Sequence, residues 1–234
     1  MLLTLSNLLA LRTTIVPSLT TQFENAFSVK LTEETKTIKD VLGQIDERLF
    51  KSYTRPAVEE LRSIIRLGIS SADWPPPPDT KPQEVRPYIY NTLLALVLVH
   101  TQVTTTASSL TTQVLTYLLE QVTLQLLASF KLRKPFNLAC LMQATLDIEF
   151  VAQTLTQYTT EKAGEVQSAI YLELDKGTDS EARQALQREL PEMRAVLKKL
   201  REGSRGVFGC FRRSRSGRSG TAKDDAVPSA IGNT

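Results

Sequence analysis

The sequence predicts an all-α protein in which antiparallel helical bundles stack into a rod. Apolar residues recur at intervals of three and four through most of the chain, which is the spacing of one face of a helix. No segment shows sustained alternation of apolar and polar residues, so no strand is predicted. The hydrophobic content of 41% is enough to bury a core in a chain of 234 residues.

Residues 1–71 are expected to form an N-terminal helical bundle segment. Residues 2–27 are periodic and apolar, and Pro17 should bend or restart their helix because proline lacks an amide hydrogen. A third helix is predicted to begin at Thr54-Arg55-Pro56, with threonine as the N-cap and proline in the first turn, and to end between Gly68 and Ser71. Before it, a separate second helix is predicted by one apolar stripe: Ile38, Val41, Leu42, Ile45 and Leu49.

Residues 72–86 are predicted to be a proline-rich linker. Four consecutive prolines, Pro75–Pro78, remove backbone donors and favour the extended polyproline II conformation. We interpret this stretch as a semi-rigid connector between helices. The alternative is that an aromatic groove of a partner recognises Pro75 and Pro78.

Residues 87–203 are predicted to form a C-terminal helical bundle. Its most apolar window, Leu93–Val99, is far shorter than the roughly 20 residues of a membrane span, so we expect a central helix surrounded by others. A turn is expected within residues 101–109. The next helix is predicted by apolar residues at intervals of four: Val114, Leu118, Val122, Leu126 and Phe130. The remaining helices are expected from Pro135, over residues 161–175, and from Asp179 or Ser180 to about Glu202 with a kink at Pro191.

Positive charge is concentrated at the C-terminus. Residues 204–234 are rich in Gly, Ser and Arg, and we expect a basic, mostly disordered tail that starts at about Gly203 or Ser214. Three interpretations stay open, namely a solvated terminus, attraction to anionic lipid headgroups, and contact with a partner or nucleic acid. Cys210 is a candidate for acylation. The arginines concerned lie in a stretch without acidic residues: Arg205, Arg212, Arg213, Arg215 and Arg218.

The sequence offers no catalytic or metal-binding constellation, so we expect neither an enzyme nor a cofactor. His100, the single histidine, is expected to cap a helix or to hydrogen-bond within the bundle. Asp147 and Glu149 point about 200° apart on a helix and cannot form an acid–base pair. We expect them on a solvated face or in a salt bridge to a neighbouring helix. Cys140 and Cys210 indicate neither a disulfide framework nor a metal site, which fits a reducing cytosol.

Several strings of residues resemble the C-terminal region of exocyst complex component 2. They include Arg86-Pro-Tyr-Ile-Tyr-Asn-Thr-Leu-Leu94, Ala144-Thr-Leu-Asp-Ile-Glu-Phe150 and Cys210-Phe-Arg212. Two further strings, Leu19-Thr-Thr-Gln-Phe-Glu-Asn-Ala-Phe27 and Asp40-Val-Leu-Gly-Gln-Ile-Asp46, are similar to the preceding part of the same subunit in fungi. The resemblance covers nearly all of residues 1–215 and is carried by the joint order of these strings.

The resemblance implies a non-catalytic exocyst subunit that helps to hold secretory vesicles at the plasma membrane before fusion. It implies that this chain is a fragment of a longer helical rod, with other exocyst subunits as partners and a cytoplasmic location at sites of exocytosis. The small β-rich domain that binds a Ral-type GTPase in animal members has no match here, so that activity is not carried over. The alternative function is a peripheral membrane-binding module that uses the basic tail. Neither nucleic acid nor a small-molecule substrate is expected.

Overall fold

The chain folds into α-helices joined by turns and by one longer connector between Ser70 and Pro87, which confirms the predicted all-α class. The computed structural model describes residues 1–77 and 80–211. Within these residues the extended pairing is limited to one isolated bridge between Phe136 and Thr178. The helices are α1 Leu2–Ala10, α2 Val16–Phe27, α3 Thr32–Ser70, α4 Pro87–Ala107, α5 Thr111–Arg133, α6 Leu138–Thr154, α7 Glu161–Lys176 and α8 Ser180–Gly203.

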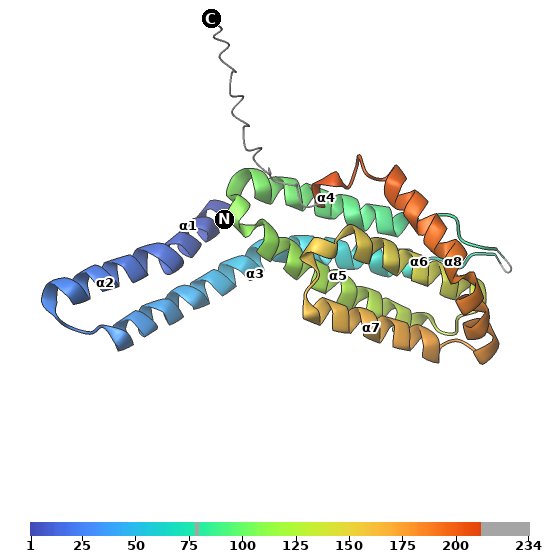
Figure 1. Ribbon diagram of the computed structural model, residues 1–234, viewed down its shortest axis with the longest axis horizontal. Coiled ribbons are helices and arrows are strands. Elements are labelled where there is room, and N and C mark those ends of the chain that lie inside the picture. The colour runs from blue at the N-terminus through green and yellow to red at the C-terminus, as the bar shows by residue number, and fades with distance from the viewer. Residues whose placement is uncertain (78–79, 212–234) are drawn as a thin grey trace, which may run out of the picture.

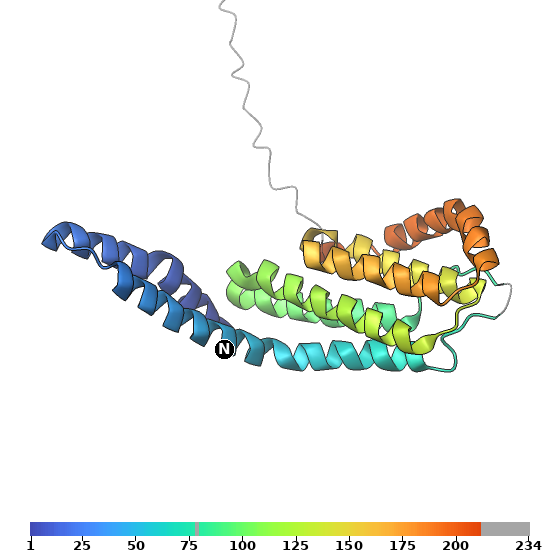
Figure 2. The ribbon, with the colours of Figure 1, turned by 90° about the horizontal axis from the view of Figure 1, so that it is seen from below.

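The molecule is elongated, with a bundle at one end and a helical hairpin at the other (Figure 1). The hairpin consists of α1 and α2 running antiparallel to the first half of α3. The second half of α3 packs with α4 and α5, and the pairs α5–α7 and α6–α8 complete the bundle. Figure 2 shows the same division after a quarter turn. Helix α3 is therefore the element that connects the hairpin to the bundle.

Helix α3 is continuous through Pro56, so the prediction of two separate helices was wrong. Proline in a helix interior removes one hydrogen bond and costs about 3 kcal/mol. Ser52, whose carbonyl loses its helical donor, is exposed to solvent. The side chains of Val58 and Leu61 are buried after the proline, and Phe50 packs against the same core before it. Packing on both sides of Pro56 thus holds the helix together.

Pro17 does not restart the helix as predicted, because residues 2–27 are helical without a break. Residues Leu11–Ile15 form a π-helical turn just before Pro17, and the backbone at both ends of this turn is right-handed helical. Such π-bulges occur inside continuous helices. Leu2 and Leu5 of α1 are buried where the hairpin meets the bundle. The N-terminal turn of α1 is therefore anchored in the main core.

The core runs through the centre of the bundle, but α4 is less enclosed than predicted. Leu93 and Leu96 are fully buried, whereas Leu98 is 72% exposed and Leu94 is also exposed. An apolar helix with one open side lies at the edge of a bundle and not at its centre. The expectation of a helix surrounded on every side was wrong, because no neighbouring helix among the described residues covers that side.

The connector between α3 and α4 is packed against the bundle. Trp74 is buried, with its ring 5.8 Å from that of Phe130 and 6.4 Å from that of Phe136. Val85 is buried as well, just before α4 begins. Aromatic side chains bury large apolar areas, so this contact fixes the path of the connector. Residues before and after it contribute to one common core.

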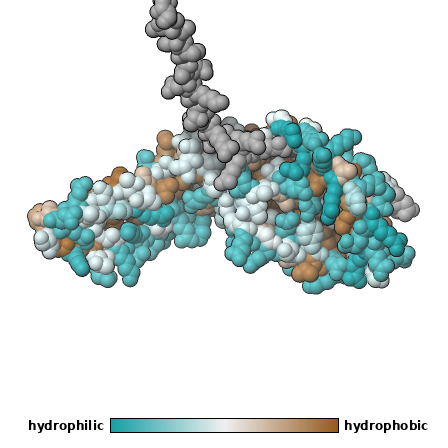
Figure 3. All heavy atoms as spheres, in the orientation of Figure 1, coloured by the Kyte–Doolittle hydropathy of each residue, from teal (hydrophilic) through white to brown (hydrophobic). Residues whose placement is uncertain are grey.

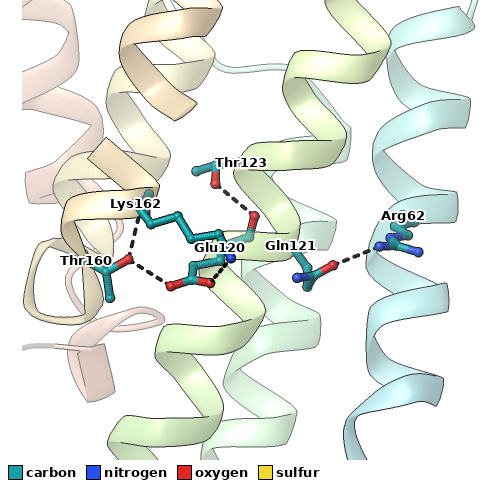
Figure 4. Close-up of polar contacts among 7 residues, drawn as sticks. Arg62, Glu120, Gln121, Thr123, Thr160 and Lys162 are labelled. Carbon is teal, nitrogen blue, oxygen red and sulfur yellow. Dashed lines mark hydrogen bonds and ion pairs between the residues drawn. The ribbon is translucent and has the colours of Figure 1, made fainter. Parts of the chain in front are cut away.

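Polar contacts tie α5 to its neighbours on both sides (Figure 4). Arg62 on α3 donates to Gln121 on α5 over 2.8 Å. On the other side of α5, Glu120 accepts hydrogen bonds from Thr160 and Lys162, each over 3.0 Å. Thr160 is also the N-cap of α7 and accepts from the amide of Ala163. The start of α7 is thus held against the middle of α5.

The last described residues close over the core after α8. Residues Gly209–Phe211 form a short 3-10 turn. Phe208 stacks on Tyr90, with ring centroids 6.3 Å apart, and the ring of Phe211 lies edge-on to His100 at 5.7 Å. Both phenylalanines are buried. The earlier of the two tail boundaries, Gly203, was therefore wrong, because these rings anchor the chain up to Phe211.

Candidate functional site

Asp147 lies in a buried polar cluster, contrary to the predicted solvated face or salt bridge. Its side chain is 0% exposed. One carboxylate oxygen accepts from the backbone amide of Arg86 and from the Gln143 amide, and the other accepts from the hydroxyl of Tyr88. Burial raises the pKa of Asp147 to about 7, although these donors and the Arg86 charge act in the opposite direction.

This cluster is a structural junction between the connector, α4 and α6. Gln143 also donates to the backbone carbonyl of Glu84, over 3.0 Å. Burial and the neighbouring Asp147 carboxylate raise the pKa of Tyr88 well above its usual value, so the phenol stays protonated as a donor. The cluster is enclosed by the bundle and has no open side for a substrate. We therefore assign it to positioning α4 on α6.

Glu149 belongs to a second chain of hydrogen bonds, which leads towards the surface. Its carboxylate accepts from Tyr171 over 2.6 Å and from the Gln153 amide over 3.1 Å. The carbonyl oxygen of Gln153 in turn accepts from Arg201 on α8 over 3.0 Å. The predicted contact of Glu149 with a neighbouring helix exists, but it is a hydrogen bond from a tyrosine of α7 instead of a salt bridge. Asp147 and Glu149 serve separate networks, as expected from their spacing.

A groove of about 570 Å³ opens beside this chain, between the C-terminal ends of α6 and α8. One side carries hydroxyl and amide side chains, including Thr154 and Gln157, and the other carries Arg201 and Arg205. Phe208 also lines the groove, and no lining residue is acidic. The size falls within the range of small-ligand sites.

Arg205 is the one predicted site residue that the structure places, and it lies at this groove. Arg212, Arg213, Arg215 and Arg218 fall outside the described residues. Arg201 was not predicted as a site residue. A signal for it existed, because Arg201 and Arg205 are four residues apart and such residues lie on one face of a helix.

The remaining candidate side chains show no constellation for catalysis. His100 lies within α4 and packs edge-on against Phe211, so the predicted cap or hydrogen bond is replaced by an aromatic contact. Partial burial lowers its pKa. Cys140 is buried and Cys210 is exposed, and both are free thiols. Among residues 1–77 and 80–211, no group of three potential metal ligands comes together.

The hairpin carries large apolar side chains that nothing in the described chain covers. On α2 they recur at every fourth residue, and on α3 they follow at intervals of three and four. Each is between 43% and 64% exposed. Figure 3 shows apolar residues reaching the surface of this hairpin. We call them the hairpin face: Ile15, Leu19, Phe23 and Phe27 of the first helical arm, and Ile38, Val41 and Ile45 of α3.

The two stripes of the hairpin face lie on the same side of the hairpin. On α2, Leu19 immediately precedes Thr20, which hydrogen-bonds to Thr35 of α3, and Phe23 immediately precedes Glu24, which accepts from Leu31 in the turn before α3. On α3, Ile45 immediately precedes Asp46, which pairs with Arg12 across the hairpin. In each arm the apolar stripe thus lies one residue, or about 100° of rotation, before the residues that face the other arm or the turn. Because the two arms run in opposite directions, this rotation turns both stripes to the same side of the hairpin.

Two helical stretches, Leu2–Phe27 and Pro87–Arg133, have the length and composition of candidate membrane spans. The second contributes much of the bundle core. The first has an apolar side and a polar side, since Arg12, Thr20 and Glu24 all contact the other arm or the turn. A helix with separate apolar and polar sides is typical of one that packs against protein on one side.

Comparison with known families gives one match. The family model described as exocyst complex component Sec5 matches residues 1–211, which is most of the chain. No curated protein and no solved structure matches the sequence. The matched range covers the hairpin and the whole bundle, and it ends at the last described residue.

Proposed function

The chain belongs to the family of exocyst complex component Sec5, and from this premise we propose that it tethers vesicles as a structural, non-catalytic part of the exocyst. Its all-α bundle and hairpin suit a role that depends on packing instead of chemistry. The proposal agrees with the resemblance to an exocyst subunit that the sequence itself carries. Its partners are other exocyst subunits, and its place of action is the cytoplasmic side of the plasma membrane where vesicles fuse.

The hairpin face is the observation that carries this proposal. Seven large apolar side chains share one side of two antiparallel helices. Contiguous exposed apolar patches of this kind mark interaction sites in soluble proteins. We propose that helices of another exocyst subunit pack on the hairpin face and complete a bundle around it.

The charges around the hairpin face favour a protein partner over a lipid surface. Arg12 and Glu24 are the only charged residues between Met1 and Phe27, and both contact the other arm or the turn. In-plane membrane helices are rich in Lys and Arg on their polar side. Protein interfaces, in contrast, are depleted of charge at their centre. The first arm of the hairpin face has the second pattern, and the α3 stripe is flanked by charges of both signs, Lys39 and Asp40.

We further propose that the chain is the C-terminal part of a rod-shaped subunit, corresponding to exocyst component 2. In this proposal residues 1–71 and 87–203 are consecutive helical segments and 72–86 is their linker, and the basic tail of the sequence is residues 212–234, since the chain packs on the bundle up to Phe211. The packed connector and the shared core support a stiff junction between these segments. Such a junction would transmit force along a tether without bending.

The proposal is tested by co-purification of the tagged 234-residue chain with the other exocyst subunits. We expect the double variant Leu19→Ser, Phe23→Ser to recover about tenfold less of them, because central apolar residues dominate interface energy. The control is Leu132→Ser, since Leu132 is 87% exposed but lies on α5, outside the hairpin face. Equal recovery by the wild type and the double variant would exclude the hairpin face. Recovery of no exocyst subunit by the wild type would exclude the tethering role.

A second candidate function is peripheral membrane binding through the basic tail. The placement of Arg205 beside Arg201 favours it, because positive charge extends from the groove into the sequence of the tail. Flotation of the chain with anionic liposomes, with and without residues 212–234, tests this function. Binding by a basic tail should weaken at high salt, and binding that is unchanged by removal of the tail would refute it.

A further inference from the structure

We propose that the groove between α6 and α8 is a binding site for a phosphorylated polyol, such as an inositol phosphate headgroup. This inference concerns a discrete site in the folded bundle. The site includes neither residues 212–234 nor the hairpin face. The groove combines two cationic side chains with hydroxyl and amide groups. The cationic side chains match the phosphate groups of such a ligand, and the hydroxyl and amide groups match its hydroxyl groups.

The two arginines supply the phosphate recognition. Arg201 and Arg205 line the same side of the groove from the last turn of α8 and just beyond it. A guanidinium offers five N–H donors in a planar fork that matches phosphate geometry. Arg201 uses one nitrogen for Gln153 and retains the others. No ion pair joins either arginine to a carboxylate in the described part of the chain.

The position of Arg201 is fixed before any ligand binds. Tyr171 and Gln153 both donate to Glu149, and Gln153 then accepts from Arg201. This chain of contacts connects α7, α6 and α8. An arginine held in this way loses less rotational freedom on binding, which favours affinity. Gln153 is therefore a positioning residue for Arg201.

The electrostatic balance at the groove is positive. Helices α6 and α8 both end here, and each C-terminus carries roughly half a negative charge. Several of these carbonyls already accept internal hydrogen bonds, for example from Ser204 and Thr156. The two guanidinium groups that line the groove carry two positive charges, and no lining residue is acidic. The Glu149 carboxylate behind Gln153 already accepts hydrogen bonds from Tyr171 and Gln153. A phosphate is therefore attracted to the arginine side of the groove.

The opposite side of the groove fits the hydroxyl groups of a polyol. Thr154 and Gln157 line it, and their side chains can both donate and accept hydrogen bonds. Phe208 adds an apolar surface against which a ring can lie. The groove volume of about 570 Å³ suits a ring with attached phosphates. Simple inorganic phosphate would leave most of this space unused.

Calorimetric titration of the 234-residue chain with inositol 1,4,5-trisphosphate tests the proposal, with inorganic phosphate as a comparison ligand. We expect the trisphosphate to bind and the double variant Arg201→Gln, Arg205→Gln to bind at least tenfold more weakly. The matched control is Lys199→Gln, which removes one charge from an exposed position of α8 outside the groove. Gln153→Leu should weaken binding less, because it leaves both arginine charges at the groove.

Vesicles distinguish a lipid headgroup from a free inositol phosphate. If the ligand is a lipid, vesicles with phosphatidylinositol 4,5-bisphosphate should bind the wild type, and the arginine double variant should lose this binding. If only the soluble trisphosphate binds, the source is a free inositol phosphate. Absence of trisphosphate binding, or equal binding by wild type and double variant, would overturn the proposal. Vesicle binding that disappears only when residues 212–234 are removed would also overturn it, in favour of the tail.

Co-purification separates this site from the tethering role. The arginine double variant should recover other exocyst subunits as well as the wild type does, because the groove and the hairpin face lie on different elements. Circular dichroism and thermal unfolding confirm that the variant is folded.

Discussion

The hydroxyl of Tyr88 donates a hydrogen bond to the carboxylate of Asp147 over 3.0 Å, and both side chains are buried. This contact joins the first turn of α4 to the middle of α6. It lies where the proline-rich connector enters the bundle, since Arg86 bonds to the same carboxylate. The junction therefore helps to fix how the bundle continues after the connector.

Removal of the Asp147 carboxylate should destabilise the fold strongly. Asp147→Ala leaves the Arg86 amide and the Tyr88 hydroxyl without this acceptor and leaves Gln143 with Glu84 alone, and we expect a loss of about 3 to 5 kcal/mol in the free energy of unfolding. Urea denaturation measures it. Asp175→Ala is the control, because Asp175 pairs with Arg183 at the surface, and it should change stability by less than about 1 kcal/mol. Equal losses in the two variants would contradict the structural role of Asp147.

The raised pKa of Asp147 also predicts a pH dependence of stability. The pKa is about 7 in the folded state against 3.8 in a free side chain, so the folded state holds this proton more tightly. Between about pH 4 and pH 7 unfolding therefore releases a proton, and stability decreases as the pH rises through this window. The size of the effect is on the order of 4 kcal/mol at most.

Asp147→Asn isolates that contribution, because the amide does not titrate. We expect the wild type to lose more stability than Asp147→Asn between pH 4.5 and pH 7, as measured by chemical denaturation at each pH. Carboxylates with lowered pKa values, such as Glu173 beside Lys134, act in the opposite direction but are common to both proteins. Parallel pH profiles for the two proteins would show that Asp147 does not titrate in this window.

Gly68 permits the close approach of α3 and α4. A Cβ atom at this position would lie 2.2 Å from Cβ of Tyr88, which is too close for any real contact. Gly68→Ala should therefore destabilise the protein by about 1 to 3 kcal/mol or more, because the two helices must move apart. Thermal unfolding and urea denaturation both report this change.

Gly43→Ala is the matched control on the same helix. Nothing lies within 4 Å of a Cβ built at Gly43. This substitution should stabilise α3 by about 0.5 to 1 kcal/mol, since alanine is the better helix former. The two variants are thus expected to have effects of opposite sign, and destabilisation by both would refute the role given to Gly68.

Glu120 should contribute more than an ordinary surface ion pair. Its side chain accepts from both Thr160 and Lys162 and is mostly buried, so Glu120→Ala should cost about 1 to 2 kcal/mol and loosen the start of α7. Hydrogen exchange of the first amides of α7 measures the loosening. Glu59→Ala removes an exposed pair with Arg55, and it should change stability by less than about 0.5 kcal/mol. Unchanged exchange in α7 would contradict the bracing role.

Helix positions were the part of the fold that could be predicted well from the sequence. The interval of four in α5 marked residues that are all buried, from Val114 to Phe130. Asp179 was one of two predicted caps for α8, and its carboxylate accepts from the amide of Ala182 over 2.7 Å. These features depend on residues within one or two turns, so local sequence contains the information needed.

The candidate sites were less predictable. Arg205 was named from charge alone and the four-residue spacing of Arg201 was left unused, but the groove itself arises only when the ends of α6 and α8 meet. The apolar stripe of α3 was read as a helix face without indication of whether it was covered. Apolar spacing marks the side that avoids water and does not identify the element that covers it.

The sequence by itself determined the all-α class, most helix boundaries and the resemblance to an exocyst subunit. Only the tertiary structure decided that α3 runs through Pro56, that Asp147 is buried while Leu98 is exposed, and that the hairpin face stays open. The physical reason is that helix formation is governed by nearby residues, whereas burial depends on which distant segments pack together. A proline defect or a buried carboxylate persists only where such packing offsets its cost.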